Sequence, residues 1–113
     1  PLDVTGGIFF LKSDGAATIS FIVEKDSTQS TLSLPNSLAD DTFMTLGFVY
    51  DPKDQKFHVF QNNVLAGTVV STNAPDDEEL TVSFGIQNGA AAAKTLTVDY
   101  VGAMKERTAV TEL

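Results

Sequence analysis

Residues 43–70 read FMTLGFVYDPKDQKFHVFQNNVLAGTVV, and their pattern is typical of consecutive β-strands. Apolar and polar side chains alternate within each run, as expected for a strand with one buried face. Pro52 lies in the first break at a favourable turn position, and Asn62-Asn63 forms the second break. Asn tolerates the positive φ angles that a tight hairpin requires. The stretch therefore predicts antiparallel strands joined by short turns, at 43–50, 57–61 and 64–70.

The same alternation recurs outside this stretch. In residues 17–25 the odd-numbered apolar residues are expected to point inward, and the even-numbered residues to form a mostly solvated face with Ile22 as the exception. The split is cleanest in residues 80–86, where four apolar side chains alternate with Thr, Ser and Gly. Further runs of this kind are 7–11, 29–34 and 96–100.

Strands at this spacing, separated by turn residues, are typical of a sandwich or barrel. Residues 89–94 contain four consecutive Ala, but the segment is too short for a stable helix, so we expect a loop or a single turn. The chain is therefore predicted to be all-β, an antiparallel β-sandwich. We expect one domain over 1–113, with its core at 5–107 and a C-terminal tail at 108–113.

Composition excludes several classes of function. The 113 residues contain no Cys, so disulfides, thiolate metal sites and Cys nucleophiles are excluded. No apolar run approaches the roughly 20 residues that span a bilayer, and the start PLDVTGG lacks the pattern of a signal peptide, so no membrane association is expected. Fifteen acidic against seven basic residues give a net charge of −8, which repels phosphate backbones, so no nucleic-acid binding is expected. The acidity has two interpretations: solubility, or a partner with a basic surface.

No catalytic constellation is apparent. His58, the only His, lies in the predicted strand 57–61 on the face opposite Phe57 and Val59, where a surface role is expected. Asp99 is a carboxylate inside a predicted strand, and we expect it to face solvent. The other carboxylates gather mainly in turns, and without Trp there is no large aromatic platform for a sugar cleft. We therefore predict that the chain is not an enzyme and assign no catalytic residue.

The acidic turns are the remaining candidates for a metal site. Asp51 and Asp54, with nearby carbonyls, could supply several of the six to eight oxygens that calcium takes. The segment lacks the full D-x-[DN]-x-[DN]-G loop pattern, and residues 76–79 form a charge run that is more often a solvated turn. Asp51 and Asp54 are therefore weak metal candidates, and no cofactor is expected.

Two neighbouring segments carry a family resemblance. Leu46–Asp51 followed by Phe57–Ala66 resembles the laminin-G/concanavalin-A-like fold, in which a strand ending in Tyr-Asp precedes a hairpin that turns at Asn. This resemblance implies a jelly-roll sandwich. It is shared by lectins, glucanases and adhesion modules, so the fold alone does not decide the function.

A more specific resemblance spans residues 5–107. The segments Thr5–Gly15, Leu80–Gly89 and Ala93–Arg107 together resemble structural proteins encoded among the head genes of tailed bacteriophages. Those relatives carry a longer N-terminal part that contributes further strands, so this sandwich is expected to be incomplete without such strands or a partner. An open sheet edge is an aggregation hazard unless another chain pairs with it.

The resemblance implies a capsid decoration or cement subunit. Its partners would be the major capsid protein or neighbouring copies of itself, in an oligomer or on the lattice, and its location the capsid surface of the virion after synthesis in the host cytoplasm. The alternative is a carbohydrate-binding or host-adhesion module of the lectin type. The features that favour the alternative are Tyr50, Tyr100 and the acidic pair at 51 and 54.

Overall fold

The computed structural model describes residues 6–13, 15–75, 97–98 and 101–103. The chain divides into two units, residues 1–80 and 81–113. Within the described ranges, every regular element lies in the first unit. Thr97, Val98 and residues 101–103 have no regular secondary structure, so no strand is seen at the described part of 96–100. The predictions that lie outside the described residues concern 76–79, 80–86, 89–94, Asp99, Tyr100 and the tail 108–113.

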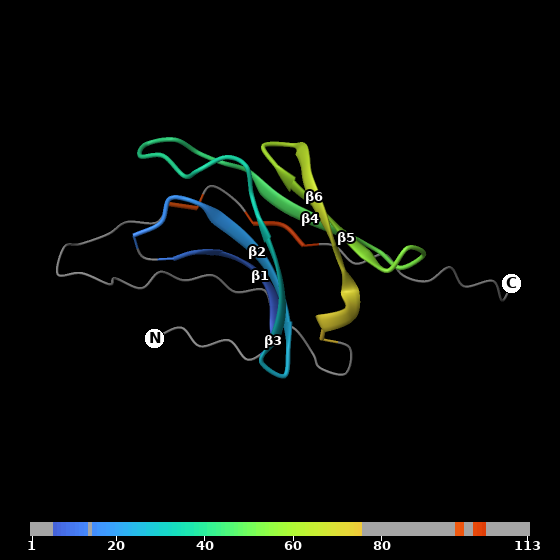
Figure 1. The fold of residues 1–113 in the computed structure, drawn as a ribbon. Helices are drawn as coiled ribbons and strands as arrows, with labels where there is room; N and C mark the ends of the chain where they lie inside the picture. The colour runs from blue at the N-terminus through green and yellow to red at the C-terminus, as the bar shows by residue number, and fades with distance from the viewer. Residues whose placement is uncertain (1–5, 14, 76–96, 99–100, 104–113) are drawn as a thin grey trace, which may run out of the picture. The chain divides into compact units, whose positions relative to one another are not determined.

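The first sheet contains β1 (Gly7–Lys12), β2 (Ile19–Lys25) and β3 (Thr28–Ser33) in the order β1-β2-β3, and every pair is antiparallel (Figure 1). Asp26 and Ser27 join β2 to β3 with φ angles of 50° and 64°, the backbone that a two-residue hairpin requires. This turn was not singled out from the sequence. β2 also begins at Ile19 rather than Ala17, because the Ala17 carbonyl accepts a hydrogen bond from the backbone of Leu38 at 2.8 Å.

The second sheet contains β4 (Leu46–Asp51), β5 (Lys56–Gln61) and β6 (Val64–Val70) in the order β4-β5-β6, again antiparallel. The predicted turn at Asn62-Asn63 is confirmed, with φ angles of 54° and 66°. One extra residue, Ala66, forms a bulge between the pairs Leu65–Phe60 and Gly67–Val59. A short 3₁₀ turn, η1 (Ser71–Asn73), follows β6.

The hydrophobic core lies between the two sheets. Inward side chains alternate as predicted: Phe21 and Val23 on β2 and Phe57 and Val59 on β5 are buried. The ring of Phe21 lies 5.2 Å from that of Phe10 in its own sheet, and 5.3 and 5.9 Å from those of Phe48 and Phe57 in the other. The fold is therefore all-β, two antiparallel three-stranded sheets with almost no helix, and it is compatible with a β-sandwich.

Two features of the sheets differ from a closed sandwich with wet outer faces. Within the described part of the chain, β1, β3, β4 and β6 each pair on one side only, whereas β2 and β5 pair on both. On the outer face of β2, Ile22 and Glu24 are 5% and 8% exposed, so the prediction that this face is mostly solvated is wrong at Glu24. β2 is the middle strand, and the register places Phe9 and Thr31 on either side of Ile22.

Candidate functional site

The outer face of the β4-β5-β6 sheet carries three of the exposed large apolar side chains of the described strands. Its register forms three rows across the sheet. The rows are Gly47–Phe60–Leu65, Val49–His58–Thr68 and Asp51–Lys56–Val70.

Several aliphatic side chains on this face have no cover. Val49, Leu65 and Val70 are 59%, 53% and 51% exposed, respectively. Burial of a fully exposed Val or Leu side chain stabilises by roughly 1.5–3 kcal/mol, so these half-exposed residues could each contribute about half of that to binding. Isolated exposed apolar residues are ordinary, but here three lie on one face of a sheet. Val49 is on one edge strand and Leu65 and Val70 are on the other, with the middle strand β5 between them.

The sequence carries a signal for this face that the alternation analysis did not use. Val49 is an apolar residue at a position of 43–50 that a one-sided strand would make polar. Residues 64–70, VLAGTVV, are apolar at nearly every position, so they cannot bury all their side chains on one face. These outward apolar residues form the apolar part of the face, which they share with the polar residues of the middle and last rows.

His58 lies on this outer face, opposite in direction to Phe57 and Val59, as predicted. Its Nε2 is 3.9 Å from Oδ2 of Asp51, and the two side chains are about one-third exposed. A partly exposed pair at this distance contributes little to stability, typically below about 1 kcal/mol. His58 therefore adds a polar group to the middle row of the face.

The turn between β4 and β5 holds the two weak metal candidates. Oδ1 of Asp51 accepts a hydrogen bond from the backbone N–H of Lys53 at 3.0 Å, which closes an Asx turn. Asp54 is exposed in the same turn, and Gln55 follows it with a φ of 54°. Among the described residues, no group of three His, Cys, Asp or Glu side chains is arranged to hold a metal ion. The contacts of Asp51 in the structure are therefore the Lys53 N–H of its own turn and His58.

A hollow of about 450 Å³ opens on the inner side of β4. Phe48 and Tyr50 form one wall, and the ring of Tyr50 lies 4.9 Å from that of Phe57. The other lining residues are Ile8 of β1 and the segment after β6, with Ser71, Ala74 and Pro75. The structure thus places Tyr50, which the sequence offered as a sugar-stacking residue, in an aromatic hollow with few polar side chains.

No helix in the described ranges has the length and apolar character needed to cross a membrane. Comparison of the chain with protein-family models, with curated proteins and with solved structures found no match in any of the three. The geometry above and the sequence resemblance are therefore what a functional proposal has to rest on.

Proposed function

We propose that the chain is a structural, protein-binding domain, and that its role is that of a capsid decoration subunit of a tailed bacteriophage. The observation that carries the binding role is the outer face of β4-β5-β6, where Val49, Leu65 and Val70 are more than half exposed. The sequence resemblance to phage head proteins supplies the partner, and the laminin-G/concanavalin-A-like jelly roll belongs to the same proposal.

The mechanism is mechanical. A subunit that binds the assembled shell and not the free shell protein stabilises the shell by mass action. The partner is the major capsid protein or a neighbouring copy of this chain, and repetition on a symmetric lattice adds avidity. The sheet that carries this face packs its inner side on the aromatic core, where the ring of Phe21 contacts rings from both sheets.

Two measurements test this role. Mass spectrometry of purified particles should find the chain in many copies per particle. Binding of the isolated chain to purified shells should fall when Val49→Ser and Leu65→Ser are combined, whereas Thr31→Ala, an exposed position on the other sheet, should leave it unchanged. The proposal is contradicted if the chain is absent from particles, or if the double substitution leaves binding to shells unchanged.

The aromatic hollow favours a second candidate function, a carbohydrate-binding or host-adhesion module. Sugar rings stack on exposed aromatic faces, and Tyr50 and Phe48 are each about two-fifths exposed beside the hollow. This candidate predicts signals on an oligosaccharide array that Tyr50→Ala removes. If the chain is a stable monomer that does not bind shells but binds the array, the carbohydrate-binding role replaces the capsid role.

A further inference from the structure

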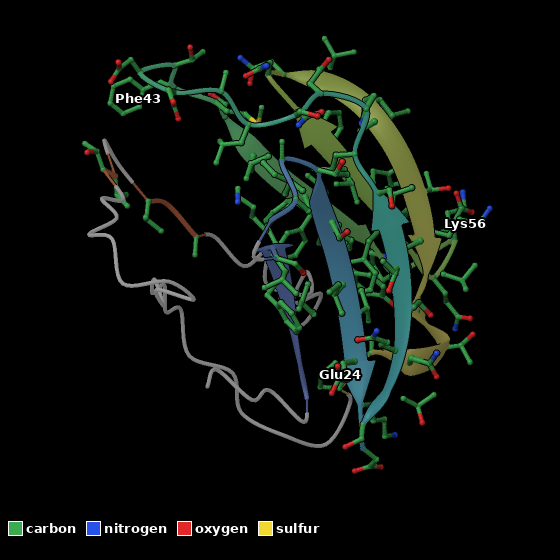
Figure 2. All side chains as sticks on the ribbon, turned by 60° about the vertical axis from the view of Figure 1, so that its left-hand side comes forward. Glu24, Phe43 and Lys56 are labelled. Carbon is green, nitrogen blue, oxygen red and sulfur yellow. The ribbon has the colours of Figure 1, made fainter. Side chains whose placement is uncertain are left out.

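The loop between β3 and β4, residues 34–45, carries the most exposed large apolar side chain among the described residues. Phe43 is 70% exposed, and Figure 2 shows it at the end of the loop away from the two sheets. The sequence pattern assigned Phe43 to a strand, but β4 begins only at Leu46. The side chain of Phe43 therefore does not pack in the core, and the fold would lose no core contact if Ser or Gln stood at this position.

The base of this loop is fixed by one buried side chain. Gln61 of β5 is 1% exposed, and its Oε1 accepts a hydrogen bond from the backbone N–H of Asn36 at 2.9 Å. Its Nε2 donates to the Asn36 carbonyl at 2.7 Å and lies 3.1 Å from Sδ of Met44. One residue thus ties down both arms of the loop, on either side of the tip.

A second set of bonds holds the arm that leads into β4. The backbone N–H of Asn62 donates to the Thr45 carbonyl at 2.8 Å, and Asn62 Oδ1 accepts from the Thr45 N–H at 3.1 Å. The other arm is held where the Leu38 N–H donates to the Ala17 carbonyl at 2.8 Å. A loop fixed at both arms loses little conformational entropy on binding, which is the advantage of a preorganised contact.

The tip next to Phe43 is acidic. Asp40 and Asp41 are exposed, and residues 34–45 contain no Lys, Arg or His. Asp41 has a φ of 53°, and Thr42 Oγ1 donates to the Asp40 carbonyl at 3.1 Å, so the chain turns tightly and presents Phe43 beside two carboxylates. An aromatic anchor bordered by negative charge complements an apolar socket bordered by positive charge.

We propose that this loop is a docking element that inserts Phe43 into an apolar socket on a protein surface rimmed with Lys or Arg. A second copy of this chain is a poor source of such a socket, because it has seven Lys and Arg against fifteen acidic residues. This argument concerns the socket alone and leaves contacts between copies through other faces unaffected. Nucleic acid and anionic lipid are poor occupants because Asp40 and Asp41 repel phosphate. The inference concerns the chemistry of the partner surface, so it does not depend on the capsid role.

Selection from a displayed library of small folded domains with randomised surfaces, against the full chain, tests this chemistry directly. The enriched domains should present an apolar pocket rimmed with Lys or Arg. Phe43→Ser should weaken the best of them by about tenfold or more. Asp40→Asn with Asp41→Asn should weaken binding at low salt and have less effect at high salt, where the charges are screened.

The matched control is Leu11→Ser, an exposed apolar residue on β1. It should leave binding of the selected domains unchanged, and thermal melting should show that all the variants remain folded. Selected domains without basic residues beside the pocket, binding unchanged by Phe43→Ser, or no enrichment at all would overturn the proposal. A concentration-dependent dimer in sedimentation that Phe43→Ser dissolves would assign the loop to a second copy instead.

Discussion

The two sheets share one core and one hairpin design, yet their outer faces differ. On the middle strands, Ile22 of β2 is buried whereas His58 of β5 is about one-third exposed, and the edge strands beside β5 leave Val49 and Leu65 more than half exposed. Both sheets turn through two residues with positive φ, at Asp26-Ser27 and at Asn62-Asn63. The alternating inward residues form the core that both sheets share. The outward apolar side chains that stay exposed are the candidates for binding.

The largest expected effect belongs to what the sheets share. Phe21 is fully buried and its ring contacts rings from both sheets, so Phe21→Ala should lower the free energy of unfolding by about 3–5 kcal/mol. Phe43→Ala, which removes an exposed Phe, should change it by about 0.5 kcal/mol or less. Urea unfolding followed by circular dichroism measures both. Equal losses would mean that Phe43 is also packed.

The next effect separates the two outer faces. Ile22→Thr and Val49→Thr both keep a β-branched side chain, so strand propensity changes little. At the buried Ile22 the substitution loses apolar contacts and buries a hydroxyl, and should cost about 2–4 kcal/mol. At the exposed Val49 it should cost about 0.5 kcal/mol or less. A large loss at Val49 would show that the β4-β5-β6 face is covered in the isolated chain.

The sequence predicted the strands better than their ends. Alternation identified the inward residues Phe21, Val23, Phe57 and Val59, because one-sided burial leaves a local pattern with period two. It extended the strands too far at Ala17 and Phe43. The Ala17 carbonyl bonds to Leu38 in a loop, and Thr45, just before β4, bonds to Asn62 in the β5–β6 turn. Those partners are distant in sequence, so no local pattern reports them.

The candidate sites were predictable only in part. The turn at Asn62-Asn63 has a local signal, whereas Ser27 is an unusual residue for positive φ and gives none. Gln61 occupies an inward position on β5, and its bonds to Asn36 cross 25 residues of sequence. The sequence therefore did not predict that the loop at 34–45 is held in place, and the structure was needed to show it. The outward Val49 was visible in the sequence as a break in alternation, and its exposure needed the structure.

A third prediction compares two glycines of the β4-β5-β6 sheet. A Cβ on Gly67 would lie 3.0 Å from Cδ2 and 3.1 Å from Cδ1 of Leu32, so Gly67→Ala forces Leu32 to shift and should cost about 1 kcal/mol. A Cβ on Gly47 meets nothing within 4 Å, so Gly47→Ala should stabilise by about 0.4–1 kcal/mol through the unfolded state. Denaturation midpoints measure both. A gain at Gly67 would mean that the sheets are less tightly packed at Leu32 than the distances indicate.

The smallest expected effect compares the two hairpin turns. Ser27 and Asn63 occupy the same second position of a two-residue turn, with φ angles of 64° and 66°. A left-handed backbone costs an ordinary L-residue about 1–2 kcal/mol. Asn bears less of this cost because its short side-chain amide forms local hydrogen bonds. Glycine removes the cost and adds an entropic penalty of about 0.5–1 kcal/mol. Ser27→Gly should therefore stabilise by up to about 1 kcal/mol, and Asn63→Gly by less than about 0.5 kcal/mol.

Asn62 is not a suitable partner for this comparison, because its Oδ1 also holds Thr45 at the base of the loop. The two substitutions lie in different sheets, so their effects on the free energy of unfolding should add in the double variant. Urea unfolding of the two single variants and the double variant supplies all three numbers. If Asn63→Gly stabilises as much as Ser27→Gly does, the two turns must also differ in something besides how well Asn and Ser tolerate positive φ.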